Sequence, residues 1–280
     1  MSQPNASHSP SPDDIARHYA SGYEAQRLEA RTGLIERERT RELLIRFLPP
    51  APATILDVGG GPGGYACWLA KQGYAVHLID ITPLHVQMAS EASQRQPEAP
   101  LASTTVGDAR ALAWGGGTVD AVLLLGPLYH LTEEVDRLQA LREAQRVLKP
   151  GGVQLAVGIS RFASAFDGLR SGYLKDPDFA AIVEQDLKTG HHRNPTGNPA
   201  YFMDTFFHLP DGLSQEVAGA GFSIAGVFGI EGPSWLLPDI GAWWQNDELR
   251  QRLLHIARTL ETEPNLLGVS PHLMAVARRE

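Results

Sequence analysis

Hydrophobic positions alternate between the spacing of strands and the spacing of helices over residues 53–160 of this chain. Short apolar runs rich in β-branched residues are typical of buried strands, and apolar residues three or four positions apart are typical of helices. The strands predicted in this way cover residues 53–58, 74–80, 101–107, 119–126 and 153–160, and the helices between them cover residues 64–72, 83–96 and 133–148. Because strands that alternate with helices of this length pair in parallel, the pattern predicts an α/β fold with a doubly wound sheet.

The pattern changes on both sides of this region. Residues 1–12 are rich in Ser and Pro and predict a disordered tail, whereas residues 13–48 have helical spacing and predict an N-terminal helical cap. Residues 160–210 have no clean period and predict an insertion, not a further strand and helix. Strand and helix patterns return after that and end with a strand over residues 272–279. We therefore expect residues 13–280 to form one domain.

Charge and composition narrow the possible partners. The net charge of -8 disfavours nucleic acid as a partner, because an acidic surface does not attract a phosphate backbone. No apolar run approaches the ~20 residues that a spanning helix needs, and the N-terminus has no apolar signal-peptide core. We therefore expect no membrane association and a cytoplasmic location. The single cysteine, Cys67, excludes an intramolecular disulfide, and the oligomeric state stays open between monomer and homodimer.

A glycine-rich turn follows the first predicted strand. The stretch ILDVGGGPGGYACWLA contains Gly59, Gly61 and Gly64 at the spacing that seats a dinucleotide. Such a turn also suits S-adenosylmethionine, which carries an ammonium and a sulfonium in place of two phosphates. Asp57 favours the second ligand, because a carboxylate a few ångströms from a phosphate is repelled by roughly 3 to 4 kcal/mol at an effective dielectric of 20.

Two further carboxylates predict an adenosine site. Asp80 ends the second predicted strand, about 20 residues after the glycines, where it can accept both ribose hydroxyls. The dinucleotide and S-adenosylmethionine share this ribose, so Asp80 does not choose between them. Asp108 and the backbone of Ala109 follow the third predicted strand, where an adenine edge would lie.

Together these segments resemble the class I (Rossmann-like) S-adenosylmethionine-dependent methyltransferases. The matching segments are LDVGGGPGG, the strand-end Asp80, GDA at residues 107–109, LLLGPLYHL and EAQRVLKPGG, in that order. The resemblance runs from about residue 54 to residue 158 and again over the C-terminal strands. It implies a seven-stranded, mostly parallel sheet with helices on both faces and an antiparallel last strand, with the helical cap and the insertion added to it.

The resemblance also implies which residues bind S-adenosylmethionine. The predicted cofactor site consists of Tyr19, Tyr23, Arg27, Asp57, Gly59, Gly61, Gly63, Asp80, Ile81, Asp108, Ala109, Leu125 and Gly126. In it the glycines wrap the methionine part, and Leu125 and Gly126 lie beside the sulfonium. Tyr19 and Tyr23 are expected to close over the cofactor, where an aromatic face attracts a desolvated cation by about 1 to 2 kcal/mol.

Methyl transfer requires alignment and exclusion of water, because the leaving thioether is neutral. An acceptor that carries a proton also needs a base, and a histidine suits that role near neutral pH. The predicted catalytic residues are Tyr129 and His130, after the fourth strand, and His191 in the insertion. The aromatic residues of the insertion and the N-terminal helices are expected to cover this site. No metal site is predicted.

The sequence therefore predicts a methyltransferase that acts on an O, N or C atom of a small-molecule acceptor. One alternative keeps the cofactor but makes the protein a cyclase or lyase on the same fold. Another makes tRNA or a protein the acceptor, and the acidic balance counts against RNA. The last alternative is a cofactor-binding module without catalysis, which leaves the aromatic insertion without an explanation.

Overall fold

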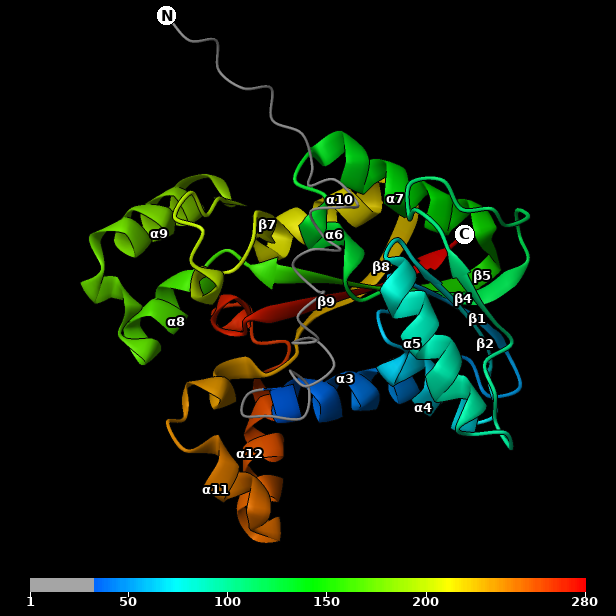
Figure 1. Ribbon diagram of the computed structural model, residues 1–280, viewed down its shortest axis with the longest axis horizontal. Helices are drawn as coiled ribbons and strands as arrows, with labels where there is room; N and C mark the ends of the chain where they lie inside the picture. Colours follow the sequence, from blue (N-terminus) through cyan, green and yellow to red (C-terminus); the bar gives the residue numbers. More distant parts are fainter. Residues whose placement is uncertain (1–32) are drawn as a thin grey trace, which may run out of the picture.

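A single mixed sheet runs through the computed structural model, which describes residues 33–280 (Figure 1). Its long strands are β1 Thr54–Val58, β2 Ala75–Asp80, β3 Ser103–Val106, β4 Val119–Leu124, β5 Leu148–Ser160, β8 Phe222–Gly229 and β9 His272–Arg279. The pairs from β3 through β2, β1 and β4 to β5 are parallel, and β9 is antiparallel to both β5 and β8. The prediction of a mostly parallel sheet with an antiparallel last strand is confirmed.

The sheet has nine strands where seven were expected. The two additional strands are β6 His191–His192 and β7 Thr205–His208, both within the insertion. β7 pairs with the last two residues of β5, beyond the part of β5 that pairs with β4, and β6 pairs antiparallel with β7. The difference arises because β5 extends past its neighbour and leaves backbone groups that a further strand satisfies.

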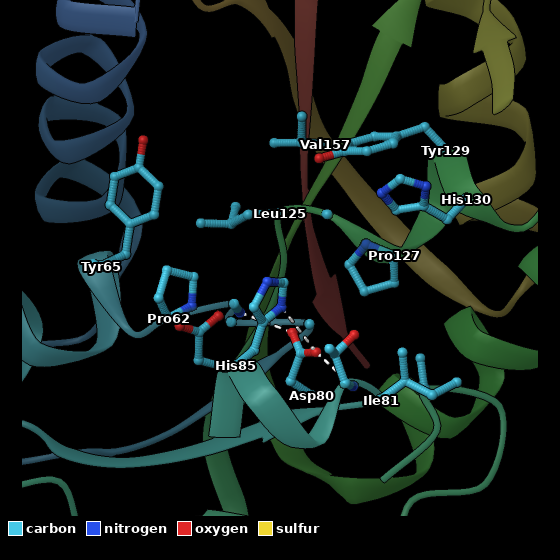
Figure 2. Close-up of a pocket in the computed structure, with 18 of the residues that line it drawn as sticks. Pro62, Tyr65, Asp80, Ile81, His85, Leu125, Pro127, Tyr129, His130 and Val157 are labelled. Carbon is cyan, nitrogen blue, oxygen red and sulfur yellow. Dashed lines mark hydrogen bonds and ion pairs between the residues drawn. The ribbon is translucent and has the colours of Figure 1, made fainter. Parts of the chain in front are cut away.

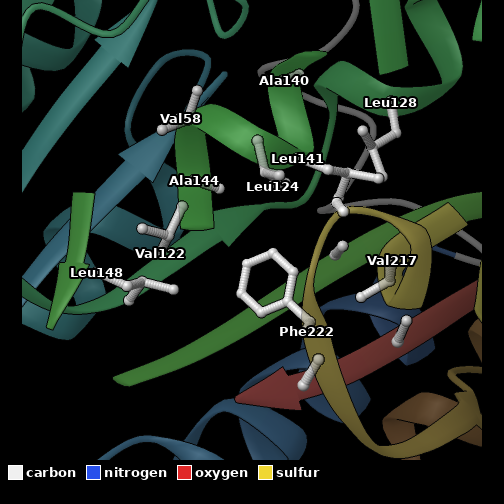
Figure 3. Close-up of a cluster of buried hydrophobic side chains, with 14 of the residues drawn as sticks. Val58, Val122, Leu124, Leu128, Ala140, Leu141, Ala144, Leu148, Val217 and Phe222 are labelled. Carbon is white, nitrogen blue, oxygen red and sulfur yellow. The ribbon is translucent and has the colours of Figure 1, made fainter. Parts of the chain in front are cut away.

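Helices cover both faces of the sheet. One face is covered by α3 Gly33–Phe47, α4 Gly64–Lys71 and α5 Pro83–Gln94, and the other by α6 Pro127–His130, α7 Glu134–Val147 and α10 Pro210–Gly219. Neighbouring residues of one strand therefore enter different cores: Ile55 packs with α3 and α4, whereas Leu56 packs with α7 and α10. Figure 3 shows the second core, where Phe222 and Val217 face α7. Burial on both faces explains why these strands are almost continuously apolar.

The insertion is a small folded unit. It contains α8 Ala163–Ser171 and α9 Pro177–Thr189, short 3-10 helices at Tyr173–Lys175 and Pro199–Tyr201, and the β6–β7 hairpin. Phe179, Ile182, Val183 and Tyr201 form its own apolar cluster. In Figure 1, α8 and α9 lie to one side of the sheet. The elements are too short and varied to give a clean period in the sequence.

The C-terminal part differs from the sequence prediction at one point. The helical pattern over residues 243–262 is divided into α11 Ile240–Gln245 and α12 Asp247–Leu260. Asn246 adopts an extended conformation, and its side chain accepts a 3.1 Å hydrogen bond from the amide of Leu249, so it begins a new helix. Two 3-10 helices, Gly232–Leu236 and Leu267–Val269, flank these elements.

The predicted cap is described only in part. Its second helix is confirmed as α3, which ends before Pro49, whereas the tail and the first helix lie outside the described residues. Across residues 33–280, every helix is too short or too polar to cross a membrane.

Candidate functional site

A cavity of about 320 Å³ opens where β1, β2 and β4 end. The loops that follow these strands form most of its wall, and α3 and β5 complete it. The carboxyl ends of parallel strands meet at one edge of the sheet, which is where open α/β sheets bind ligands. Figure 2 shows side chains from these loops converging on the cavity.

The glycine loop forms one wall because its residues have conformations that other residues avoid. Gly59, Gly61 and Gly63 have φ angles of 70°, 56° and 89°. A Cβ on Gly59 would lie 2.5 Å from Cγ of Pro127, so the loop contacts the start of α6 directly. A Cβ on Gly61 would meet nothing within 4 Å, because this residue faces open space. The glycines of the loop therefore bring main chain to the cavity, and Pro62 lines it beside them (Figure 2).

Two carboxylates lie behind this loop. Asp57 is 2% exposed, and burial, helped by the charge of Asp80, raises its pKa to about 7. The carboxylate of Asp80 is fixed by three contacts: the amide of Gly61 donates to Oδ2 at 2.8 Å, the amide of Thr82 donates to Oδ1 at 2.8 Å, and Nδ1 of His85 lies 3.3 Å from Oδ1. The buried carboxyl group of Asp57 and the pre-oriented carboxylate of Asp80 therefore stand side by side at the sheet edge.

Asp108 and Ala109 line the cavity as predicted, but Asp108 has an additional partner. The guanidinium of Arg110 contacts both of its carboxylate oxygens at 2.7 to 3.1 Å, and the amide of Arg110 donates to Oδ1. Burial raises the pKa of Asp108, but these hydrogen bonds outweigh burial and leave the pKa below its usual value. Asp108 is therefore held in place by Arg110, which itself pairs with Asp136.

Tyr129 and His130 come from α6, a helix of four residues that follows β4. Both are buried, at 9% and 7% exposure, and their ring centroids lie 4.7 Å apart. Figure 2 shows them at the end of the cavity away from Asp80, near Val157. The structure therefore separates a carboxylate end of the cavity from an aromatic and imidazole end.

His191 lies on β6 and is not among the residues that line the cavity. Burial, with Arg193 nearby, lowers its pKa, and its ring packs edge-on against Phe206. The adjacent His192 is buried between the carboxylate of Asp186, at 2.8 Å, and the carbonyl of Tyr201, at 2.7 Å. Within the described residues, no part of the insertion lines the cavity, so a catalytic role for His191 stays a prediction.

Most of the predicted site residues are brought together. The cavity is lined by Asp57, Gly59, Gly61, Asp80, Ile81, Asp108, Ala109, Leu125, Gly126, Tyr129 and His130. Gly63 is instead the residue that precedes α4 and is absent from the wall. Tyr19, Tyr23 and Arg27 lie outside the described residues.

Sequence reasoning missed two parts of the wall. His85 occupies the first turn of α5 and contacts Asp80, and the short distance in sequence between the two could have indicated this. Glu36 and Thr40 line the cavity from α3, and so do Arg37 and Arg41. Glu36 and Thr40 are four positions apart, as are Arg37 and Arg41, so the four side chains share one face of the helix. This spacing of polar residues is the signal in the sequence that could have indicated a polar face.

One group in residues 33–280 has the composition of a metal site. Ligand atoms of Glu36, Glu231 and His272 lie within 4.8 Å of one another. His272 Nδ1 is 2.6 Å from Oε1 of Glu231, and the hydroxyl of Ser270 donates to Oε2 of the same carboxylate at 2.9 Å. Glu231 is thus held by both Ser270 and His272, and the sequence predicted neither these contacts nor a metal here.

Comparison with known proteins agrees with this geometry. Residues 56–156 match the family model described as a methyltransferase domain. Residues 56–156 therefore carry a methyltransferase domain. This chain is 32% identical over 126 residues to a ubiquinone/menaquinone biosynthesis C-methyltransferase of Acidiphilium cryptum, covering 45% of this chain and 49% of that protein. It is 37% identical over 106 residues to erythromycin 3''-O-methyltransferase of Saccharopolyspora erythraea, covering 37% of this chain and 33% of that protein.

The likeness in fold extends further than the likeness in sequence. The crystal structure of the [4+2]-cyclase SpnF superimposes with a TM-score of 0.61 at 15% identity, covering 98% of this chain and 97% of that one. By contrast, the chain spans about half or less of the length of the two curated relatives described above. The likeness in fold thus extends along nearly the whole chain, whereas the sequence matches cover less than half of it.

S-adenosylmethionine is the cofactor of this family, and the residues of the cavity fit it. Gly60 lets the main chain of the loop lie directly against the strand ends, since a Cβ there would lie 2.8 Å from both Oδ2 of Asp57 and Cδ1 of Leu78. The buried carboxylate of Asp57 suits a cationic group, because a positive partner offsets the cost of its burial. The fixed carboxylate of Asp80 has the geometry to accept hydroxyl groups.

Proposed function

We propose that the protein is an S-adenosylmethionine-dependent methyltransferase that acts on a small-molecule acceptor. The observation that carries the proposal is Asp57, whose carboxylate is buried at the glycine loop with a pKa near 7. A protein does not retain such a group for stability, because an ionised acid in that position is costly. A cationic ligand in the adjoining cavity explains it.

The role proposed for each residue follows from its place in the cavity. The amides of the glycine loop and Asp57 would hold the amino-acid part of the cofactor, and Asp80 would hold the ribose. Asp108 and Ala109 would lie beside the adenine. When bound, S-adenosylmethionine supplies an electrophilic methyl group and a neutral leaving group. The chain then has to align the acceptor and exclude water.

Tyr129 and His130 would form the acceptor end. His130 is the proposed base where the acceptor is an alcohol, phenol or protonated amine, because an imidazole accepts a proton near neutral pH. Tyr129 would align the acceptor through its ring and hydroxyl. His191 remains a second candidate for the base. This role would require the insertion to approach the cavity.

The acceptor atom is proposed only as O, N or C. The two curated relatives are named as a C-methyltransferase and an O-methyltransferase, so they support methyl transfer to small molecules without choosing the atom. A cyclase or lyase reaction is the second candidate. In this candidate reaction the sulfonium of S-adenosylmethionine is attacked at a carbon other than the methyl group. The whole-length fold match to a protein described as a [4+2]-cyclase supports only the general point that this fold hosts other reactions.

The remaining parts are proposed to serve the same activity. The α3 wall and the insertion of residues 160–210 would cover the acceptor end, and residues 13–280 would act as one catalytic domain. The acidic net charge supports a small acceptor over tRNA. A location in the cytoplasm is part of the same proposal.

Calorimetry with S-adenosylmethionine and S-adenosylhomocysteine tests the cofactor part of the proposal. We expect both to bind wild-type protein, and Asp57→Asn to bind both more weakly. Binding of neither compound would overturn the proposal. Tight binding of NAD with no binding of adenosyl compounds would point to a dinucleotide enzyme.

Mass spectrometry tests the reaction. The protein is incubated with S-adenosylmethionine and, separately, a hydroquinone, a catechol, a primary amine and a hydroxylated macrolide. A methylated product together with S-adenosylhomocysteine supports methyl transfer. Loss of the methylated product in His130→Gln supports His130 as the base. Methylthioadenosine as the product would support the cyclase or lyase instead.

A further inference from the structure

Arg137 is a buried arginine of α7 that contacts the main chain next to the acceptor end of the cavity. The residue is 2% exposed. Its Nη1 donates to the carbonyl oxygens of Leu131 and Thr132 at 2.9 and 2.8 Å. These two residues directly follow Tyr129 and His130. A buried carbonyl left without a donor costs about 1 to 3 kcal/mol, so Arg137 supplies the partners that this stretch of chain would otherwise lack.

The short helix α6 depends on such contacts. It consists of four residues, Pro127–His130, and the chain leaves helical geometry at Leu131, where φ is -87° and ψ is 89°. A helix of one turn has too few internal hydrogen bonds to form by itself. The positions of Tyr129 and His130 are therefore set by what holds the end of α6, and Arg137 holds it.

The other edge of the same guanidinium is fixed by Glu216 of α10. Nε and Nη2 of Arg137 donate to its two oxygens at 2.7 to 3.1 Å, and Nε2 of His208 is 3.1 Å from Oε2. Burial by itself raises the pKa of Glu216, but the hydrogen bonds from His208 and Arg137 outweigh it and hold the pKa at about 2. Glu216 therefore stays ionised and balances the buried charge of Arg137.

The flat face of the guanidinium contacts the insertion. Its central carbon lies 3.6 Å from the ring centroid of Phe206, a distance at which a desolvated cation–π contact forms. Phe206 belongs to β7 and pairs with His191 of β6. One side chain thus touches the acceptor end of the cavity, the helix α10 and the hairpin of the insertion.

We propose that Arg137 is a positioning residue for the transfer site, which fixes the segment carrying Tyr129 and His130 and ties it to the β6–β7 hairpin. The catalytic role of this segment rests on the proposed function. The hydrogen bonds by which Arg137 fixes the segment are a property of the fold. Through Arg137 the insertion is linked to the acceptor end, even though no described residue of the insertion lines the cavity.

The same helix offers a matched control. Arg146 also pairs with a glutamate, Glu143, and donates to two carbonyl oxygens, those of Trp114 at 2.7 Å and Leu112 at 2.9 Å. None of these partners lines the cavity. Lysine at either position keeps the charge but loses the planar fork that reaches two carbonyls at once. Arg137→Lys and Arg146→Lys therefore remove similar contacts at different places.

The experiment compares wild type and both variants in complex with S-adenosylhomocysteine. Hydrogen–deuterium exchange reports residues 127–132, and NMR reports the imidazole protons of His130, assigned with His130→Gln. In Arg137→Lys we expect exchange in this segment to be about tenfold faster, as loss of roughly one hydrogen bond predicts. The His130 signals should shift or broaden, while affinity for S-adenosylhomocysteine changes by less than about threefold, because Arg137 does not line the cavity. Arg146→Lys should change neither readout.

A lower melting temperature in Arg137→Lys with unchanged exchange and unchanged His130 signals would overturn the proposal and leave Arg137 as a scaffold residue. If Arg137→Lys fails to fold, Phe206→Leu removes only the ring contact. Movement of the His130 signals in that variant supports the tie to the hairpin, and unchanged signals reject it. Absence of S-adenosylhomocysteine binding by wild type would reject the proposed function. The exchange data would still show whether Arg137 fixes residues 127–132.

Discussion

The amide of Gly61 donates a 2.8 Å hydrogen bond to Oδ2 of Asp80, which fastens the glycine loop after β1 to the last residue of β2. The bond spans two neighbouring parallel strands, so the loop and the proposed ribose site form one rigid unit. It also means that a change at Asp80 affects both the ligand contact and the loop.

Asp80→Asn should therefore weaken S-adenosylhomocysteine binding by about 10- to 100-fold, since hydrogen bonds to a charged group contribute about 1.5 to 3 kcal/mol. The NH2 group that replaces one carboxylate oxygen cannot accept, so either the hydrogen bond from Gly61 or the one from Thr82 is lost. Calorimetry measures the effect. Asp120→Asn is the control, because Asp120 accepts from Thr54 and Lys149 and does not line the cavity. Equal affinities in the two variants would contradict the assigned role of Asp80.

Asp57→Asn should stabilise the folded protein at high pH. In the folded state the pKa of Asp57 is raised from 3.8 to about 7, so the folded state binds the proton more tightly than the unfolded state. The unfolding free energy of wild type therefore falls as pH rises from about 4 to about 7, by at most about 4 kcal/mol from this group. Denaturant unfolding at pH 5 and pH 8 measures the difference between variant and wild type. If the unfolding free energy of Asp57→Asn exceeds that of wild type by the same amount at both pH values, Asp57 titrates normally.

The same residue should make cofactor binding depend on pH. Below about pH 7 Asp57 is protonated in the free protein, and a cationic ligand favours its ionised form, so binding must release a proton. Affinity for S-adenosylhomocysteine should fall as pH decreases below about 7, approaching tenfold per pH unit. Asp57→Asn should bind weakly with a flat profile between pH 5.5 and 8. A steep profile in the variant would assign the titration to another group.

Gly59→Ala and Gly61→Ala should separate the structural role of the loop from its ligand role. Both residues have positive φ, which costs a non-glycine residue roughly 1 to 2 kcal/mol. Only at Gly59 would the new Cβ also collide with Pro127, at 2.5 Å, so Gly59→Ala should lose more unfolding free energy and displace α6. Gly61→Ala should lose mainly S-adenosylhomocysteine affinity, because its methyl group points into open space at the cavity. Thermal unfolding and calorimetry on both variants measure this. Full affinity in Gly61→Ala would show that the loop is only a tight turn.

Local signals in the sequence were sufficient for the framework and for the carboxylate end of the cavity. The alternation of strand and helix patterns predicted the parallel sheet because each strand has to bury both of its faces. Asp57, Gly59 and Asp80 were found because strand ends and turns fix such residues within a few positions of one another. The division of the last helical pattern at Asn246 was missed, although a capping residue stood in it.

The aromatic end of the cavity, which we propose binds the acceptor, was decided by contacts between residues far apart in the chain. The pattern of the insertion could not show that Phe179 and Tyr201 pack on each other and leave the cavity to α3 and Val157. Nor could it show that Arg137 pairs with Glu216, 79 positions away. Periodicity and turn chemistry operate over one or two turns of chain, so the sequence by itself determined the strands, the glycine loop and its acids. Which side chains line the aromatic end of the cavity depends on how whole elements pack, and only the tertiary structure decided that.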